Sequence, residues 1–143
     1  MKIIKYFFQF LFIIILFSLF KILGLNISSA LSGKLFEKIG PLFRSKKLVH
    51  SNIKKAFPNI SLSDLNKITK LMWNNYGRVF AEYMFIKHFR KDVSNKNIKI
   101  EGQEILEDIK RKNKSVVFIS GHLSNFELMA MHIEKSEIKL AAI

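Results

Sequence analysis

An apolar segment near the N-terminus places the strongest constraint on what this chain can fold into. Residues 6–20 are apolar at all but two positions, and through Leu25 the segment reaches 20 residues with a single charge, Lys21. A helix needs about 20 apolar residues to cross a bilayer, and a lysine side chain is long enough to reach the membrane interface. We therefore predict a membrane-anchor helix over residues 1–25.

Two other interpretations of this segment remain open. The residues Ser28-Ser29-Ala30 follow an apolar stretch of suitable length and form an acceptable cleavage site for a signal peptide. Alternatively, the helix lies along the membrane surface without crossing it.

The positive charge of the chain is concentrated next to the apolar segment. Residues 1–100 hold 18 Lys and Arg against 4 Asp and Glu, whereas residues 101–143 hold 6 against 7. This distribution favours an anionic membrane surface over nucleic acid as the partner. The positive-inside rule then keeps the following domain in the cytoplasm. The basic residues after the segment are Lys34, Lys38, Arg44, Lys46, Lys47, Lys54 and Lys55.

Helical periodicity dominates the first half of the remaining chain. Apolar spacing predicts an amphipathic helix that breaks at Gly40-Pro41, followed by a short helix over residues 43–57. A longer amphipathic helix is expected over residues 65–84, with Ser61 or Ser63 as its N-cap. On that helix Arg78 and Glu82 are four residues apart and are expected to pair. We interpret its aromatic stripe as core packing, and contact with an acyl chain is the alternative.

The second half alternates between short apolar runs and helical segments. Strands are expected over residues 98–101, 115–120 and 139–143, with helices over residues 104–112 and 126–133. This order is typical of a βαβ unit with a parallel sheet. The predicted fold class is therefore α/β: an anchor and amphipathic helices, followed by the start of a sheet.

One short motif carries candidate chemistry. His122 and Glu127 are five positions apart and directly follow the predicted strand. With His122 in the turn and Glu127 in the first turn of the next helix, a carboxylate would orient an imidazole that takes a proton from a hydroxyl group. Gly121 would allow close approach of a substrate, and Asn125 would supply a hydrogen bond. This spacing alone is weak, because a His and a Glu five residues apart often occur by chance.

Other kinds of site have little support. The chain has no cysteine, and the spacing of His132 from His122 fits no common metal pair. No metal and no cofactor are expected, and His50 and His88 are expected at the surface.

Four segments together resemble one known family. They are the apolar N-terminus; Ser51-Asn52-Ile53-Lys54-Lys55-Ala56-Phe57-Pro58; Trp73-Asn74-Asn75-Tyr76-Gly77-Arg78-Val79-Phe80-Ala81-Glu82; and Gly121-His122-Leu123-Ser124-Asn125-Phe126-Glu127. In this order they resemble the late acyltransferases of lipid A biosynthesis, the lauroyl/myristoyl transferases. The family usually has Gly-His-Phe-Gly-Asn-Trp-Glu at the last segment, so Leu123 and Ser124 depart from its pattern.

The resemblance implies an enzyme of the bacterial inner membrane whose active domain faces the cytoplasm. It would transfer an acyl group from acyl carrier protein to a hydroxyl of a lipid A precursor. His122 would be the general base and Glu127 its partner, with Gly121, Asn125 and Arg78 binding substrate.

Family members are about twice as long as this chain. Residues 26–143 are therefore expected to be the N-terminal part of an acyltransferase domain, with doubtful activity alone. The alternative is a non-catalytic basic protein that binds anionic lipid.

Overall fold

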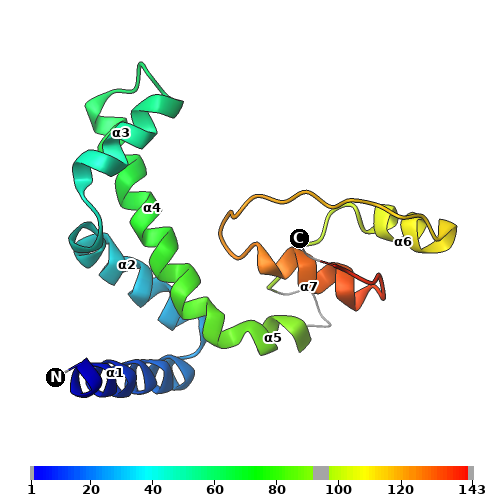
Figure 1. Ribbon diagram of the computed structural model, residues 1–143, viewed down its shortest axis with the longest axis horizontal. Helices are drawn as coiled ribbons and strands as arrows, with labels where there is room; N and C mark the ends of the chain where they lie inside the picture. Colours follow the sequence, from blue (N-terminus) through cyan, green and yellow to red (C-terminus); the bar gives the residue numbers. More distant parts are fainter. Residues whose placement is uncertain (1, 92–96, 142–143) are drawn as a thin grey trace. The chain divides into compact units, whose positions relative to one another are not determined.

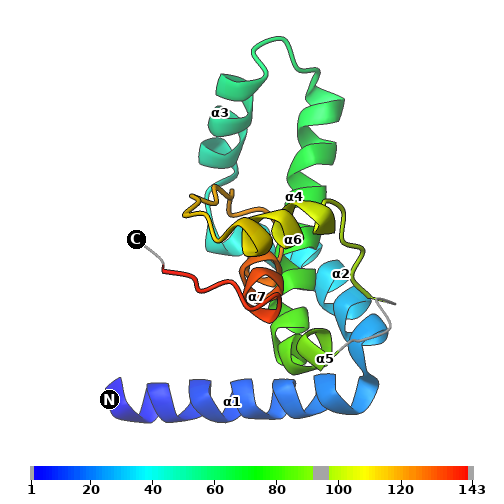
Figure 2. The same ribbon diagram turned by 90° about the vertical axis from the view of Figure 1, so that its right-hand side faces the viewer.

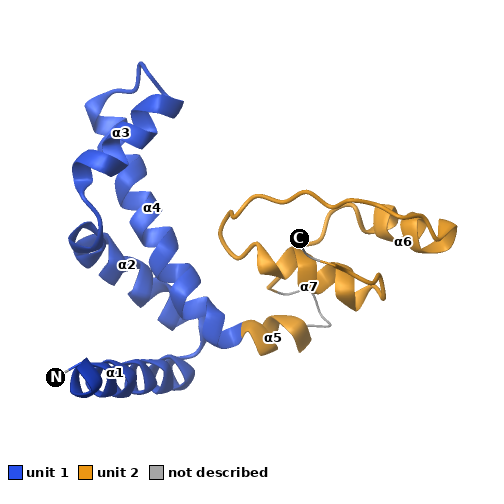
Figure 3. Cartoon of the chain, in the orientation of Figure 1, with its two compact units in different colours: residues 1–85 blue, residues 86–143 orange. Residues whose placement is uncertain are grey.

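Helices are the only regular elements in the computed structural model, which describes residues 2–91 and 97–141 (Figure 1). The chain divides into two compact units, Met1–Phe85 and Ile86–Ile143 (Figure 3). The first unit contains α1 (Lys2–Leu23), α2 (Leu25–Phe43), α3 (Lys46–Ala56), α4 (Leu62–Glu82) and the 3₁₀ turn η1 (Tyr83–Phe85). The second contains α5 (Ile86–Lys91), α6 (Gln103–Lys112) and α7 (Glu127–Lys135).

Helix α1 covers the apolar segment and fits a membrane anchor by length and composition. Its 22 residues correspond to about 33 Å of helix, which matches the hydrocarbon thickness of a bilayer. Nearly all its large apolar side chains are exposed, and only Phe20 is buried. Helix α1 lies across one end of the α2–α4 pair (Figures 1 and 2), so its apolar surface is not covered by the unit it belongs to.

A glycine makes the sharp turn between α1 and α2 possible. Gly24 has φ 76°, in the left-handed region that residues with side chains adopt at a cost. The turn is closed on the far side by the buried Ser28, whose Oγ donates to the carbonyl of Phe20 over 2.9 Å. The direction in which α2 leaves α1 is therefore determined by this turn and its hydrogen bond.

Helices α2 and α4 form the core of the first unit by packing small residues together. Gly40 lies directly under the indole ring of Trp73, where a β-carbon would come within 2.3 Å of the ring. The remaining small buried residues of the seam are Ser28, Ser29, Ser32 and Gly33 on α2, and Thr69, Gly77 and Ala81 on α4. Trp73 of the aromatic stripe thus serves core packing, whereas Tyr76 is 57% exposed, so the prediction holds for only part of the stripe.

A cluster of four phenylalanines joins α1 to this core. The ring of Phe80 on α4 lies 5.7 Å from the ring of Phe17, 6.3 Å from Phe20 and 5.7 Å from Phe36, measured between centroids. Aromatic pairs at this separation each contribute about 0.5–1.5 kcal/mol beyond their burial. The C-terminal end of α1 is therefore part of the folded unit.

Local signals located most of the helices, but they missed α5 and predicted one break that does not occur. Ser61 caps α4: its Oγ accepts from the Asp64 backbone N–H over 3.1 Å, which confirms one of the two predicted caps. The break predicted at Gly40-Pro41 is wrong, because α2 continues to Phe43. Pro41 removes only one backbone hydrogen bond so close to the helix end, and the packing of Trp73 on Gly40 holds this turn in place.

The predicted sheet is wrong: no strand occurs within the described residues. The segments 98–100, 114–123 and 138–141 are irregular, and residues 142–143 of the third predicted strand lie outside the described part of the chain. Val117 and Ile119, expected to be buried in a strand, are 88% and 91% exposed. A strand is stable only when another backbone pairs with it, and within the described residues no segment pairs with this one.

The second unit is held together by contacts of α7. Phe89 of α5 and Ile133 of α7 are its buried apolar residues, and Arg90 donates to Glu134 over 2.7 Å on the surface. His132 of α7, for which the sequence suggested no partner, lies 2.6 Å from the side-chain oxygen of Gln103 at the start of α6. His132 therefore joins α6 and α7.

Candidate active site

The predicted catalytic motif lies where the irregular segment 114–123 turns into α7. The Leu123 backbone N–H donates to the Gly121 carbonyl over 2.7 Å, which makes a tight three-residue turn with His122 at its centre. Residues 121–124 are exposed. The imidazole of His122 is consequently presented to solvent at the outside of a turn.

Phe126 contacts the imidazole. The ring centroids of His122 and Phe126 are 4.2 Å apart, with the planes at 79° in an edge-to-face arrangement. Phe126 is half-buried and immediately precedes α7. It therefore acts as a wall that limits the orientations of the His122 ring.

Glu127 is the first residue of α7, as the sequence predicted. Carboxylates are favoured at this end of a helix, where the unpaired backbone N–H groups create a positive potential. Glu127 and Asn125 are both half-buried. The ring contact described for His122 is with Phe126, so the pairing of His122 with Glu127 stays a prediction.

Ser124 adopts a backbone conformation that the sequence did not reveal. Its φ is 49°, in the left-handed region, which costs a residue with a side chain about 1–2 kcal/mol. This is the position at which the resembled family usually has glycine. The serine that replaces the family's usual glycine therefore introduces backbone strain into the turn that carries His122.

Gly121 has open space around it. A β-carbon at this position would meet only the Leu123 side chain, at 3.4 Å and 3.6 Å, which is ordinary contact. Packing within the described chain therefore does not require a glycine here. Its predicted role in admitting a substrate remains a prediction.

Arg78, the fifth predicted site residue, belongs to the first unit, whereas the other four belong to the second. Its Nε donates to Asn74 Oδ1 over 2.8 Å and its Nη1 donates to Ser29 Oγ over 3.2 Å. Ser29 in turn donates to Glu82 Oε1 over 2.6 Å. The predicted pairing of Arg78 with Glu82 is thus relayed by a buried serine of α2, a partner that helical spacing could not reveal.

The same polar row continues toward the N-terminal end of α4. Asn74 Nδ2 donates to Glu37 Oε1 over 2.6 Å, and Lys70 pairs with the other oxygen over 3.3 Å. The hydrogen bond from Asn74, followed by Lys70 and Lys34, lowers the pKa of Glu37 below its ordinary value, against a smaller opposing effect of burial. The Trp-Asn-Asn-Tyr-Gly-Arg segment is therefore the seam between α4 and α2.

Comparison with known proteins identifies one match. A family model described as bacterial lipid A biosynthesis acyltransferase matches residues 1–143, the whole chain. No curated protein and no solved structure matches the chain.

Proposed function

The chain belongs to the bacterial lipid A biosynthesis acyltransferase family, and we propose that it transfers a fatty acyl group from acyl carrier protein to a hydroxyl of a lipid A precursor. The observation that carries this proposal is the exposed His122 at the centre of a tight turn, with Glu127 opening the helix that follows. A base that must reach a lipid-borne hydroxyl has to be accessible, and His122 is.

In the proposed reaction His122 takes the proton from the acceptor hydroxyl as its oxygen attacks the thioester carbonyl. The tetrahedral intermediate then collapses, the carbon–sulfur bond breaks, and the imidazolium returns the proton to the departing thiol. An ester forms on the acceptor and no acyl group is attached to the enzyme. Glu127 would orient the imidazole and stabilise its charged form.

The remaining site residues have supporting roles in this proposal. Gly121 leaves the face of the turn open to substrate, and Asn125 donates a hydrogen bond to the acceptor or to the thioester oxygen. Arg78 would bind substrate through the part of its guanidinium that α2 and α4 leave exposed.

We also place the reaction at the cytoplasmic face of the inner membrane. Helix α1 supports membrane attachment by its length and composition. The excess of Lys and Arg after α1 supports a cytoplasmic location for the rest of the chain.

The test is an acyl transfer assay on the purified chain with acyl carrier protein thioester and a tetraacyl lipid A precursor. Removal of a general base typically lowers the rate by about 10²–10⁴-fold, so His122→Ala should reduce turnover by that order. His132→Ala is the matched control, because His132 is bonded to Gln103 in the same unit and has no proposed catalytic role.

Two results would count against the proposal. Turnover by His122→Ala equal to that of the wild type would remove His122 as the base. Absence of turnover in the wild type with both substrates saturating would instead favour the non-catalytic lipid-binding alternative for this chain.

A further inference from the structure

Helix α3 presents a basic face that no part of the described chain neutralises. It carries four lysines, Lys46, Lys47, Lys54 and Lys55, and no Asp or Glu. None of these lysines forms an ion pair within residues 2–91 and 97–141. Lys46 and Lys47 also lie in the first turn, at the positive end of the helix dipole, where a cation is disfavoured.

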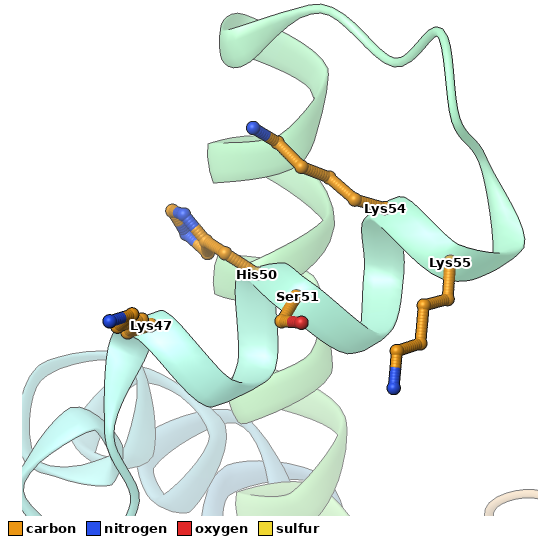
Figure 4. A pocket seen from close by; sticks show the side chains of 5 residues that line it. All are labelled: Lys47, His50, Ser51, Lys54 and Lys55. Atoms are coloured by element: carbon orange, nitrogen blue, oxygen red, sulfur yellow. The ribbon is translucent and has the colours of Figure 1, made fainter.

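Three of the lysines, Lys47, Lys54 and Lys55, lie on the side of α3 that faces away from α4, whereas Lys46 lies at the start of the helix near the side of Ile53. Helical spacing places Val49 and Ile53 together on the opposite side, and Val49 is buried, in line with the packing of α3 on α4. The basic side is hollowed into an open pocket of about 500 Å³, lined by Lys47, His50, Ser51, Lys54 and Lys55. Figure 4 shows Lys47, His50 and Lys54 extending to one side of the helix, whereas Lys55 extends to another.

The lining offers several hydrogen-bond donors to one anion. It combines ammonium groups, the Ser51 hydroxyl and an imidazole. The Nε2 atom of His50 is buried and has no hydrogen-bond partner within the described residues. Ammonium and hydroxyl donors of this kind suit the oxygens of phosphate groups.

The surroundings of the pocket favour a lipid surface over an acidic protein. Large apolar side chains are exposed on α3 and beside it: Leu42 is 84% exposed, Phe43 71%, Leu48 44% and Phe57 58%. Lysines interspersed with exposed apolar side chains are typical of segments that lie in a membrane interface.

The geometry of the first unit brings α3 to the membrane surface. Helices α1 and α3 lie at opposite ends of the α2–α4 pair, and α1 lies across that pair (Figures 1 and 2). When α1 crosses the bilayer, the α2–α4 pair runs along the membrane surface. Helix α2 is about 28 Å long, so α3 contacts the headgroups at about that distance from the anchor.

We propose that the basic face of α3 binds the phosphate groups of anionic membrane lipids and forms a second membrane contact, separate from α1. Each lysine near an anionic surface raises the equilibrium constant for membrane binding about fivefold. Replacement of three lysines should therefore lower the equilibrium constant for the contact of α3 with anionic lipid on the order of 100-fold.

The experiment uses the full chain in nanodiscs. The chain has no cysteine, so Leu48→Cys places one fluorophore at the edge of the basic face. Nanodiscs contain phosphatidylcholine alone or with phosphatidylglycerol, each with a small fraction of lipid that carries a headgroup quencher. Stronger quenching is expected with phosphatidylglycerol, and it should disappear at 1 M salt, where charges are screened beyond about 3 Å.

Matched variants locate the effect. In the labelled chain, Lys47→Gln/Lys54→Gln/Lys55→Gln should lose the response to phosphatidylglycerol. Lys91→Gln/Lys114→Gln/Lys139→Gln removes the same charge from exposed positions of the second unit and should keep the response. If the first variant loses helicity by circular dichroism, the salt dependence of the wild-type response still tests whether the labelled face binds anionic lipid electrostatically.

Three outcomes would overturn the proposal. Quenching could be equal in the two kinds of nanodisc, or unchanged by the α3 variant. The label could also respond to added acyl carrier protein in neutral nanodiscs and not to anionic lipid, which would make α3 a protein-docking surface. Acyl transfer is not measured, so the result is independent of the proposed reaction.

Discussion

Gly77 of α4 faces the backbone carbonyl of Ser32 in α2 so closely that a β-carbon at position 77 would lie 2.3 Å from the carbonyl oxygen. It would also come within 2.8 Å of the Phe36 β-carbon. The two helices therefore approach each other at the one position of this turn of α4 that has no side chain. This contact gives the glycine of the Trp-Asn-Asn-Tyr-Gly-Arg segment a packing role.

The substitution Gly77→Ala should destabilise the first unit. The added methyl group meets backbone, which cannot rotate away, and overpacking of this kind typically costs about 1–3 kcal/mol. That cost should exceed the gain of about 1 kcal/mol in helix propensity. Thermal unfolding in detergent, followed by circular dichroism, measures the change.

Asn66→Ala is the control for helix propensity, because Asn66 is exposed on the same helix. It should leave the unfolding midpoint nearly unchanged or slightly raised. A midpoint for Gly77→Ala equal to that of Asn66→Ala would contradict the close packing of α2 on α4.

The Glu37–Asn74 contact should make the first unit acid-sensitive. The folded-state pKa of Glu37 lies below its ordinary value of 4.5, so its ionised form stabilises the fold above that pH. The contribution is lost as the pH falls below 4.5 and through the folded-state pKa, because the unfolded chain binds the proton more readily.

Glu37→Gln removes this titration, so the difference in unfolding midpoint between wild type and variant should shrink as the pH is lowered through that window. Asn74→Ala removes the main hydrogen-bond donor and should also weaken the acid dependence. A difference that stays constant across the window would show that Glu37 does not contribute to it.

Ser124→Gly should stabilise the turn that carries His122. Glycine adopts a φ of 49° without the steric cost that serine bears there, and the net gain is expected to be roughly 0.5–1 kcal/mol. Hydrogen exchange of the amides in residues 121–128 measures the effect locally. Ser115→Gly, the same change at an exposed position without a positive φ, should give no gain, and equal gains in both variants would refute the strain.

Gly121→Ala should separate folding from activity. The methyl group has room in the structure, so the unfolding midpoint should stay within about 0.5 kcal/mol of the wild type. If Gly121 admits substrate as proposed, acyl transfer should nevertheless fall. A fall in both stability and activity would point to a structural role for the glycine, and no fall in either would remove it from the site.

Local sequence signals predicted most helices of this chain, but not the continuation of α2 to Phe43 or the short helix α5. The apolar run predicted α1, the Ser61 cap and the apolar spacing predicted α4, and similar spacing predicted α6 and α7 to within two residues at each end. These features could be predicted because a helix forms its backbone hydrogen bonds within one segment of the chain. Its buried side chains also recur every three or four residues. The placement of His122 in a turn and Glu127 at a helix start followed from the same reasoning.

Only the tertiary structure decided the rest. The run from Ser115 to Ser120 has strand composition but no backbone to pair with among the described residues, and pairing is a long-range event that composition cannot supply. Likewise, Ser29 became the relay between Arg78 and Glu82 because α2 packs against α4, 49 and 53 residues away in the chain. The sequence by itself determined most of the helical segments, whereas contacts between distant segments decided which polar groups meet and which apolar ones stay exposed.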